Sequence, residues 1–239
     1  NKHILVEKPL LMDKKNINLL IEEVKDSNTV CYTAYNHRFE PHFINVKNIL
    51  DSNELGQIYS CRMFYGNGTA KLVKNSLWRD KGNGVLGDLG SHLIDTCEYW
   101  FGSALKSANW KMVSYNNFEN SAPDHCVIIN NSSKIRCELE MTMLMWKNHF
   151  TCDILAQKGS VHIESLCKWG PAKIIIRKRI LPSGIPTEEQ KILIQPDPTW
   201  AEEYKFFKEL VHKKKNVNLQ WQKELNNILI NLSEKINAQ

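Results

Sequence analysis

The sequence predicts the end of a doubly wound α/β domain, followed by an α+β domain with an open, largely antiparallel sheet and helices on one face. Two observations support this fold class. The first 35 residues follow a strand, helix, strand pattern, which is typical of a parallel βαβ unit. From Gln57 onward the chain contains about eight runs rich in Ile, Val, Thr and aromatic residues, several of them joined by short links that favour hairpins.

The opening βαβ unit predicts a parallel sheet whose larger part precedes Asn1. His3 to Glu7 is an apolar run that ends in Glu7-Lys8-Pro9, Asp13 caps a helix, and Val30 to Tyr35 forms the second strand. A single βαβ unit cannot bury both faces of its sheet. We therefore interpret residues 1–35 as the remnant of a larger domain, and we expect ligands to bind at the carboxyl ends of its strands.

Residues 36–196 are predicted to form the second domain, and residues 197–239 to form helices that pack back on the core. A helix is expected from Pro41 to Leu50 and another over residues 87–101. Strands are expected over residues 57–66, 105–116, 124–131, 134–145, 148–157, 159–165, 172–181 and 190–195. A capping box at Thr199 to Glu202 predicts a helix whose Trp200 is structural and whose inward residues are Tyr204, Phe207, Leu210 and Val211.

Alternation along the predicted strands indicates that the sheet has one packed and one polar face. Arg136, Glu138 and Glu140 alternate with apolar residues. Because helices cover only one side of such a sheet, the second face needs water or a partner subunit. We therefore expect a homo-oligomer, a dimer or tetramer, formed through the open sheet face.

Composition favours a globular protein over a nucleic-acid-binding or membrane protein. Hydrophobic residues make up 42% of the chain, and the formal net charge of +5 is spread along it, so nucleic-acid binding is not expected. The sequence contains no apolar stretch of about 20 residues and no signal peptide, which predicts a cytoplasmic protein. Seven scattered cysteines without a C-x-x-C pair are expected to be reduced core residues.

Residues 78–102 hold the densest group of glycines, acids and histidine. The helix predicted from Gly87 places Asp88, His92, Asp95 and Tyr99 on one stripe, so an acid and a histidine are expected side by side. Gly82, Gly84 and Gly87 spell G-x-G-x-x-G, yet the preceding segment is charged and broken rather than a buried strand. These glycines are instead expected to let the backbone approach a ligand closely.

Four motifs in order resemble the signatures of the glucose-fructose oxidoreductase, inositol dehydrogenase and MocA family: Val6 to Leu10, Asn36 to Phe39, Trp78-Arg79, and Gly87 to Asp95. The resemblance implies the C-terminal part of a Rossmann domain followed by a substrate domain. It implies an NAD- or NADP-dependent dehydrogenase that acts on a sugar, nucleotide sugar or cyclitol. The family's Gly-rich dinucleotide turn is not in this sequence.

Chemistry and the resemblance together assign catalytic roles to Lys8, Asp88 and His92. Hydride removal from a secondary alcohol needs a base near neutral pKa, which suits His92. Asp88 could hydrogen-bond the substrate hydroxyl or orient the imidazole, and Lys8 could stabilise a developing alkoxide. By analogy with the family, the Lys8-Pro9 bond is expected to be cis.

The resemblance also implies binding residues. Glu7, Lys8, Asn36, Trp78 and Arg79 are expected to line the nicotinamide end of the cofactor. The substrate is expected to contact His37, Arg38, Asp88 and Asp95. Arg38 is an equally good candidate for a structural ion pair with Glu40 or another acid, and Asp95 for pairing with a nearby base.

Two other functions are compatible with the residues. The missing Gly-rich turn allows a non-catalytic ligand-binding or assembly subunit made of the substrate domain alone. A cluster of Asp88, His92, Asp95 and His125 would suffice for a hydrolytic metal site, although the leading interpretation includes no metal.

Overall fold

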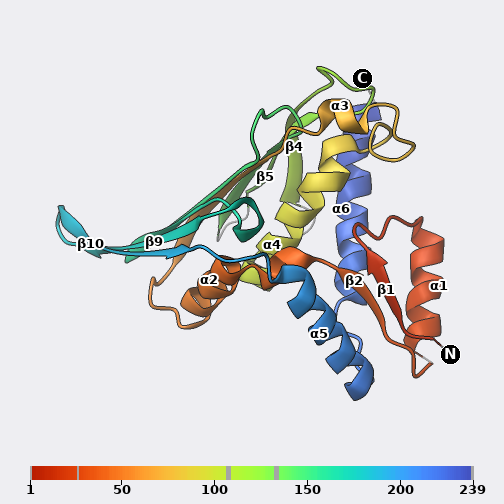
Figure 1. Ribbon diagram of the computed structural model, residues 1–239, viewed down its shortest axis with the longest axis horizontal. Helices are drawn as coiled ribbons and strands as arrows, with labels where there is room; N and C mark the ends of the chain where they lie inside the picture. The colour runs from red at the N-terminus through yellow and green to blue at the C-terminus, as the bar shows by residue number, and fades with distance from the viewer. Residues whose placement is uncertain (1, 26, 106–108, 132–134, 238–239) are drawn as a thin grey trace.

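The structure, a computed structural model, describes residues 2–25, 27–105, 109–131 and 135–237 (Figure 1). Within these residues the strands form two sheets. In the smaller sheet β1 (Ile4–Glu7) and β2 (Cys31–Ala34) are parallel and are connected by α1 (Lys14–Lys25), as the sequence predicted. All seven cysteines are free and buried, as expected for core residues.

The large sheet has the strand order β10-β9-β8-β7-β3-β6-β5-β4. Adjacent strands in this sheet are antiparallel except for β3 and β6, which run parallel. This arrangement confirms the predicted open, largely antiparallel sheet. The strands are β3 (Ile58–Gly66), β4 (Trp110–Asn116), β5 (His125–Asn131), β6 (Arg136–Thr142), β7 (His149–Ala156), β8 (Gly159–Glu164), β9 (Ala172–Ile180) and β10 (Gly184–Leu193).

Helices cover one face of the large sheet and join it to the small one. The helices are α2 (Pro41–Asp51), α3 (Ala70–Val73), α4 (Ser91–Phe101), α5 (Thr199–Lys213) and α6 (Leu219–Asn237). The main core lies between the sheet and α2 and α4, where Phe43, Leu93 and Phe150 are fully buried. Helix α6 packs against α1 and β2 on one side and against α4 and β4 on the other (Figure 1).

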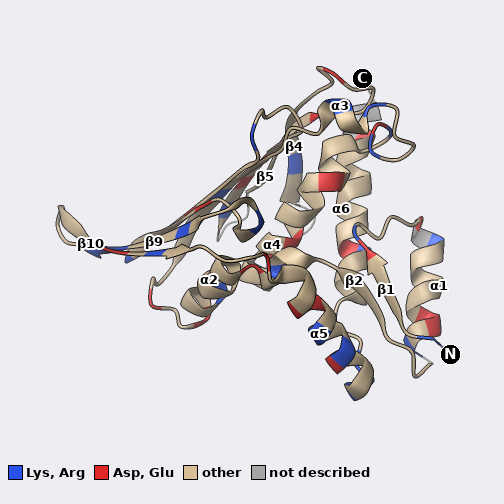
Figure 2. Ribbon diagram, viewed as in Figure 1, with Lys and Arg blue, Asp and Glu red and all other residues tan. Residues whose placement is uncertain are grey.

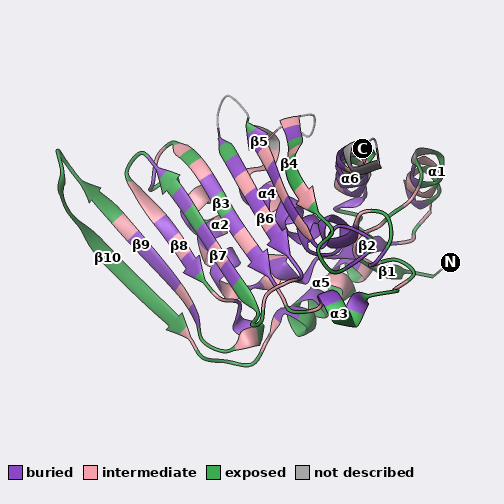
Figure 3. Cartoon of the chain, turned by 90° about the horizontal axis from the view of Figure 1, so that it is seen from above, coloured by how far each residue is buried: buried purple, intermediate pink, exposed green. Residues whose placement is uncertain are grey.

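The opposite face of the large sheet carries polar side chains and ion pairs. Along β7 buried and more exposed residues alternate (Figure 3). Arg62 and Arg136 both pair with Glu138 on this face. Positive and negative residues are interleaved along β9, β10 and α5 (Figure 2). Assembly through this open face stays a prediction.

Three local predictions were wrong. Strand β10 begins at Gly184, well before residue 190, because an exposed edge strand tolerates Pro186 and the polar residues around it. Strand β4 begins at Trp110, later than predicted, and residues 106–108 lie outside the described residues. The Thr199 capping box does not form: α5 has Pro198 as its N-cap, and the Thr199 hydroxyl oxygen instead accepts a hydrogen bond from Asn36.

Helix α5 is also rotated from its predicted orientation. Tyr204 is 56% exposed, whereas Glu203 is 3% exposed and accepts a hydrogen bond from the Tyr32 hydroxyl at 3.3 Å. Leu210 is buried, as predicted. The inward face of α5 therefore carries a carboxylate, which periodicity of apolar residues does not reveal.

Candidate active site

Glycines in the segment that leads into α4 allow close approach of other parts of the chain. Leu86–Gly90 form a wide π turn (η2) directly before α4. A Cβ atom on Gly84, which has φ +48°, would lie 2.2 Å from the carbonyl oxygen of Pro123. A Cβ atom on Gly90 would lie 2.7 Å from the Met141 sulfur. At Gly84 the approaching group is thus the Pro123 backbone, and not the ligand that the sequence led us to expect.

Lys8 and Asp88 form an ion pair between the end of β1 and the π turn. The Lys8 ammonium donates to the Asp88 carboxylate at 2.9 Å and to the Asp88 carbonyl oxygen at 2.5 Å. Arg79 Nε lies 3.4 Å from the other carboxylate oxygen. Burial lowers the pKa of Lys8, and the Asp88 carboxylate partly offsets this effect. The Lys8-Pro9 bond is cis, as the family resemblance implied.

His92 contacts another histidine instead of Asp88. Its ring stacks on that of His37 with centroids 4.0 Å apart and planes inclined by 20°. Tyr35 and Tyr65 pack around the same ring. Burial, followed by the neighbouring His37, Lys8 and Lys168, lowers the pKa of His92 well below its usual value. The imidazole is therefore neutral at pH 7 and can accept a proton.

Arg38 and Asp95 are engaged with each other. Arg38 donates two hydrogen bonds to the Asp95 carboxylate, each at 2.7 Å, and a third to Glu98 at 2.8 Å. Trp221 Nε1 also donates to Asp95. The ion-pair alternative for Arg38 therefore describes the structure, with Asp95 and Glu98 in place of Glu40. Substrate binding by Arg38, Asp95 or the buried His37 stays a prediction.

A cavity of about 370 Å³ lies where β1 and β2 end. Six of the residues singled out in the sequence line it: Glu7, Lys8, Asn36, Trp78, Arg79 and His92. Asp88 contacts Lys8 at its edge. Trp78 and Arg79 also contact each other, with the guanidinium 4.5 Å from the indole centroid. The structure thus gathers four sequence motifs around one cavity.

Three further lining residues were missed in the sequence: Lys168, Trp200 and Glu203. Trp200, which the sequence pattern assigns to structural packing, is 55% exposed and faces this cavity. The spacing of Trp200 and Glu203 by three residues on one helix was an available signal. Burial raises the pKa of Glu203 to about 7, and the negative charge of Glu7 contributes in the same direction.

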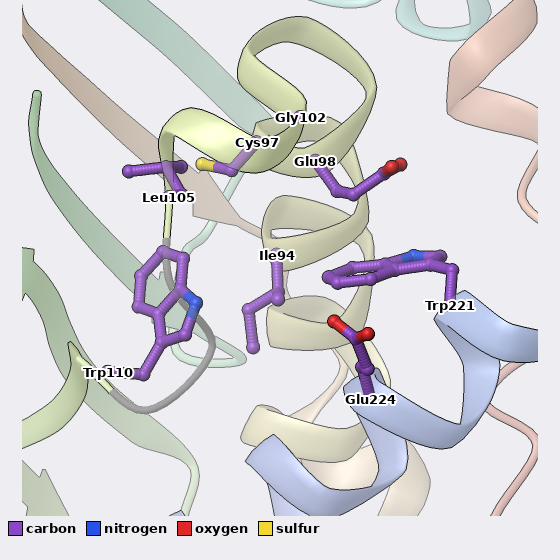
Figure 4. A pocket seen from close by; sticks show the side chains of 8 residues that line it. All are labelled: Ile94, Cys97, Glu98, Gly102, Leu105, Trp110, Trp221 and Glu224. Carbon is purple, nitrogen blue, oxygen red and sulfur yellow. The ribbon is translucent and has the colours of Figure 1, made fainter.

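A second cavity, of about 230 Å³, lies between α4, α6 and β4 (Figure 4). Trp110 and Trp221 face it together with the carboxylates of Glu98 and Glu224. Glu98 also binds Arg38, and Trp221 also binds Asp95, so this cavity lies behind the Arg38–Asp95 pair. It contains none of Lys8, Asp88 and His92.

The metal site considered for Asp88, His92, Asp95 and His125 does not form within the part of the chain that the structure describes. Across those residues, no three His, Cys, Asp or Glu side chains are placed to hold a metal ion together. Asp95 is paired with Arg38, and Asp88 with Lys8 and Arg79. Over the same described ranges, none of the helices is both long and apolar enough to span a bilayer.

The family model of the GFO/IDH/MocA C-terminal domain matches residues 43–162 of the chain. The chain is similar to glucose-6-phosphate 3-dehydrogenase of Bacillus subtilis strain 168, with 29% identity over 166 residues, or 67% of this chain and 45% of that protein. It is also similar to levoglucosan dehydrogenase of Pseudarthrobacter phenanthrenivorans, with 33% identity over 106 residues, or 42% of this chain and 27% of that protein. The chain therefore spans less than half the length of these curated relatives.

Among solved structures, levoglucosan dehydrogenase in complex with NADH resembles this chain with a TM-score of 0.80. The match covers 98% of this chain and 72% of that chain at 18% identity. At this identity the match shows that the fold is shared.

Proposed function

This chain belongs to the GFO/IDH/MocA family, and on that premise we propose that it forms part of an NAD- or NADP-dependent oxidoreductase acting on a sugar, nucleotide sugar or cyclitol. The reaction would transfer a hydride between the nicotinamide and a secondary alcohol or ketone carbon. The observation that carries this proposal is that Lys8 and His92 line one cavity while Asp88 pairs with Lys8.

The cavity has features that fit a nicotinamide. It lies at the carboxyl ends of two parallel strands, which is where ligands bind in open α/β sheets. The Trp78 and Trp200 indoles offer flat apolar surfaces, and Glu7, Asn36 and Arg79 offer polar groups. Glu7, Lys8, Asn36, Trp78 and Arg79 would hold the nicotinamide end, and the bound cofactor would accept or return the hydride.

His92 would act as the base that accepts the substrate hydroxyl proton during oxidation. Its neutral state and its place in the cavity wall suit this task. Its Nδ1 is buried and has no hydrogen-bond partner within the described part of the chain. The stacked His37 would keep the ring orientation fixed.

Lys8 would stabilise the negative charge that develops on the substrate oxygen, because its ammonium is partly buried and lines the same cavity. Asp88 would hold this ammonium in place, and Arg79 would hold the other carboxylate oxygen of Asp88. We assign Asp88 to positioning Lys8 and to binding the substrate hydroxyl.

The remaining expectations belong to the same proposal. Residues 1–35 would form the end of the dinucleotide domain, residues 36–196 the substrate-binding and oligomerisation domain, and residues 197–239 helices that pack back on the core. Assembly of a dimer or tetramer through the open sheet face and a cytoplasmic location stay predictions.

Cofactor binding provides the first test. NADH and NADPH would be titrated into the protein that contains this chain, with nicotinamide fluorescence as the readout. We expect saturable binding of at least one cofactor, weakened by Trp78→Ala. The matched control Trp146→Ala, which removes a fully exposed indole outside the cavity, should bind as the wild type does. A protein that binds neither cofactor would contradict the proposal.

A further inference from the structure

The turn between β8 and β9 places Lys168 in the wall of the cavity that Lys8 and His92 line. This turn contains the short 3₁₀ segment Cys167–Trp169 (η5). Two residues in the left-handed region enclose it, Ser165 with φ +68° and Gly170 with φ +112°. A left-handed serine is uncommon, and such strain persists only where the surroundings hold it.

A buried carboxylate holds this turn in place. Glu40, which is 2% exposed at the start of α2, accepts a hydrogen bond from the Cys167 backbone N–H at 2.9 Å and from its thiol at 3.0 Å. Asp197 contacts the same thiol at 3.7 Å and accepts from the Thr199 N–H at 2.9 Å. Lys168 is therefore attached to a rigid support that joins α2, η5 and the start of α5.

Among the cations that line the cavity, Lys168 has a distinct environment. Lys8 and Arg79 share the carboxylate of Asp88. Lys168 forms no ion pair within 4 Å in the described ranges, and its ammonium donates to the Tyr65 hydroxyl at 3.2 Å. It also lies 5.0 Å above the Trp169 ring. An ammonium has three donors, so donors remain for a ligand.

We propose that Lys168 binds an anionic substituent, a carboxylate or phosphate, on the sugar substrate and so selects acidic or phosphorylated sugars over neutral ones. This proposal rests on the proposed function, because it places the substrate carbon near His92 and Lys8. The same cavity connects these residues with Lys168. Glu40 and Asp197 lie behind the turn and are engaged by Cys167 and Thr199, so they support Lys168 without pairing with it.

The test measures binding, by isothermal titration, of a neutral sugar, the corresponding sugar acid and the corresponding sugar phosphate to the cofactor-loaded protein. Wild type, Lys168→Met and Lys168→Arg would be compared, with Lys178→Met as a control at an exposed lysine on β9. We expect Lys168→Met to weaken binding of an anionic sugar by about 10- to 100-fold more than binding of the neutral sugar. Lys168→Arg should restore much of the preference, and Lys178→Met should retain all of it.

The outcomes separate this proposal from the function on which it rests. Preference for the acid or for the phosphate alone would identify which anionic group the site takes. Equal weakening for neutral and anionic sugars, or a wild type that prefers the neutral sugar, would overturn the role of Lys168. Charge-selective binding without hydride transfer would leave the anion site standing and overturn the oxidoreductase proposal.

Discussion

The imidazole rings of His92 and His37 lie stacked, 4.0 Å apart at their centroids, in a buried part of the candidate active site. Burial is the largest cause that lowers the pKa of each ring. Both rings are therefore neutral under ordinary conditions. The pair combines a proton acceptor with a rigid aromatic support.

The lowered pKa of His92 predicts how activity depends on pH. As a base His92 must be neutral, so the acid limb of activity in sugar oxidation should lie below the usual histidine pKa of about 6.5. A profile of kcat/KM against pH would measure this limb. An acid limb centred above about pH 6.5 would argue against His92 as the base.

Stability should depend on pH through the same pair. Because the pKa of each ring is lowered in the folded state, the unfolded chain binds more protons as the pH falls. The stability from these neutral rings is complete above about pH 6.5 and is lost as the pH falls through the folded pKa.

The variant His37→Phe should reduce this pH dependence, because it keeps an aromatic ring on His92 but removes one titrating group. The free energy of unfolding would be measured with urea between about pH 7.5 and pH 5. Its slope against pH should be smaller in His37→Phe than in the wild type, by up to about 1.4 kcal/mol per pH unit. His212→Phe, at an exposed position, should retain the wild-type slope. Identical slopes for the wild type and His37→Phe would show that folding does not lower the pKa of His37.

The Arg38–Asp95 pair should be important for stability. Asp95 is 1% exposed, and its removal leaves the Arg38 guanidinium with only Glu98 as an acidic partner within the described residues. We expect Asp95→Asn to lower the free energy of unfolding by about 3 kcal/mol. Glu209→Gln, which breaks an exposed pair with Lys213, should cost less than about 1 kcal/mol. A raised KM for the sugar without loss of stability would instead identify Asp95 as a substrate ligand.

Gly84 and Gly82 form a matched pair for testing the packing of the π-turn segment. Both have positive φ, so an alanine at either position incurs about 1–2 kcal/mol of backbone strain. Only at Gly84 would the added Cβ meet the Pro123 carbonyl, whereas the space beside Gly82 is open. Thermal unfolding should show Gly84→Ala destabilised beyond Gly82→Ala by about 1 kcal/mol or more. Equal losses would contradict this packing.

The sequence was sufficient to predict the inner strands of the large sheet because their pattern reports burial directly, whereas the starts of the edge strands β4 and β10 were predicted wrongly. In β6 and β7 every second residue faces the core, and that alternation can be read from the order of apolar and polar residues alone. The rotation of α5 was not predictable in this way. Its position is fixed by Glu203 and Thr199, which bond to Tyr32 and Asn36 of distant segments.

The sequence predicted which residues gather at the candidate site better than it predicted how they are arranged. Chemistry and the family resemblance singled out Lys8, Asp88 and His92 as candidates, but helical periodicity placed Asp88 beside His92. Residues 86–90 form a π turn, which departs from the α-helical spacing on which that prediction depended, and Asp88 pairs with Lys8 instead. Lys168 escaped notice because a lysine in a turn has no periodic signal, and only the tertiary fold brings it to the cavity.

Turnover provides the most direct test of the claim that Lys8, Asp88 and His92 form one catalytic centre. Formation of NADH or NADPH during sugar oxidation would be compared between the wild-type protein and Lys8→Met, with Lys71→Met as a control at an exposed lysine. We predict that Lys8→Met lowers kcat by about 10²- to 10³-fold, because it removes the charge opposite the developing alkoxide, and that Lys71→Met turns over like the wild type. Equal kcat values for the wild type and Lys8→Met would contradict the account.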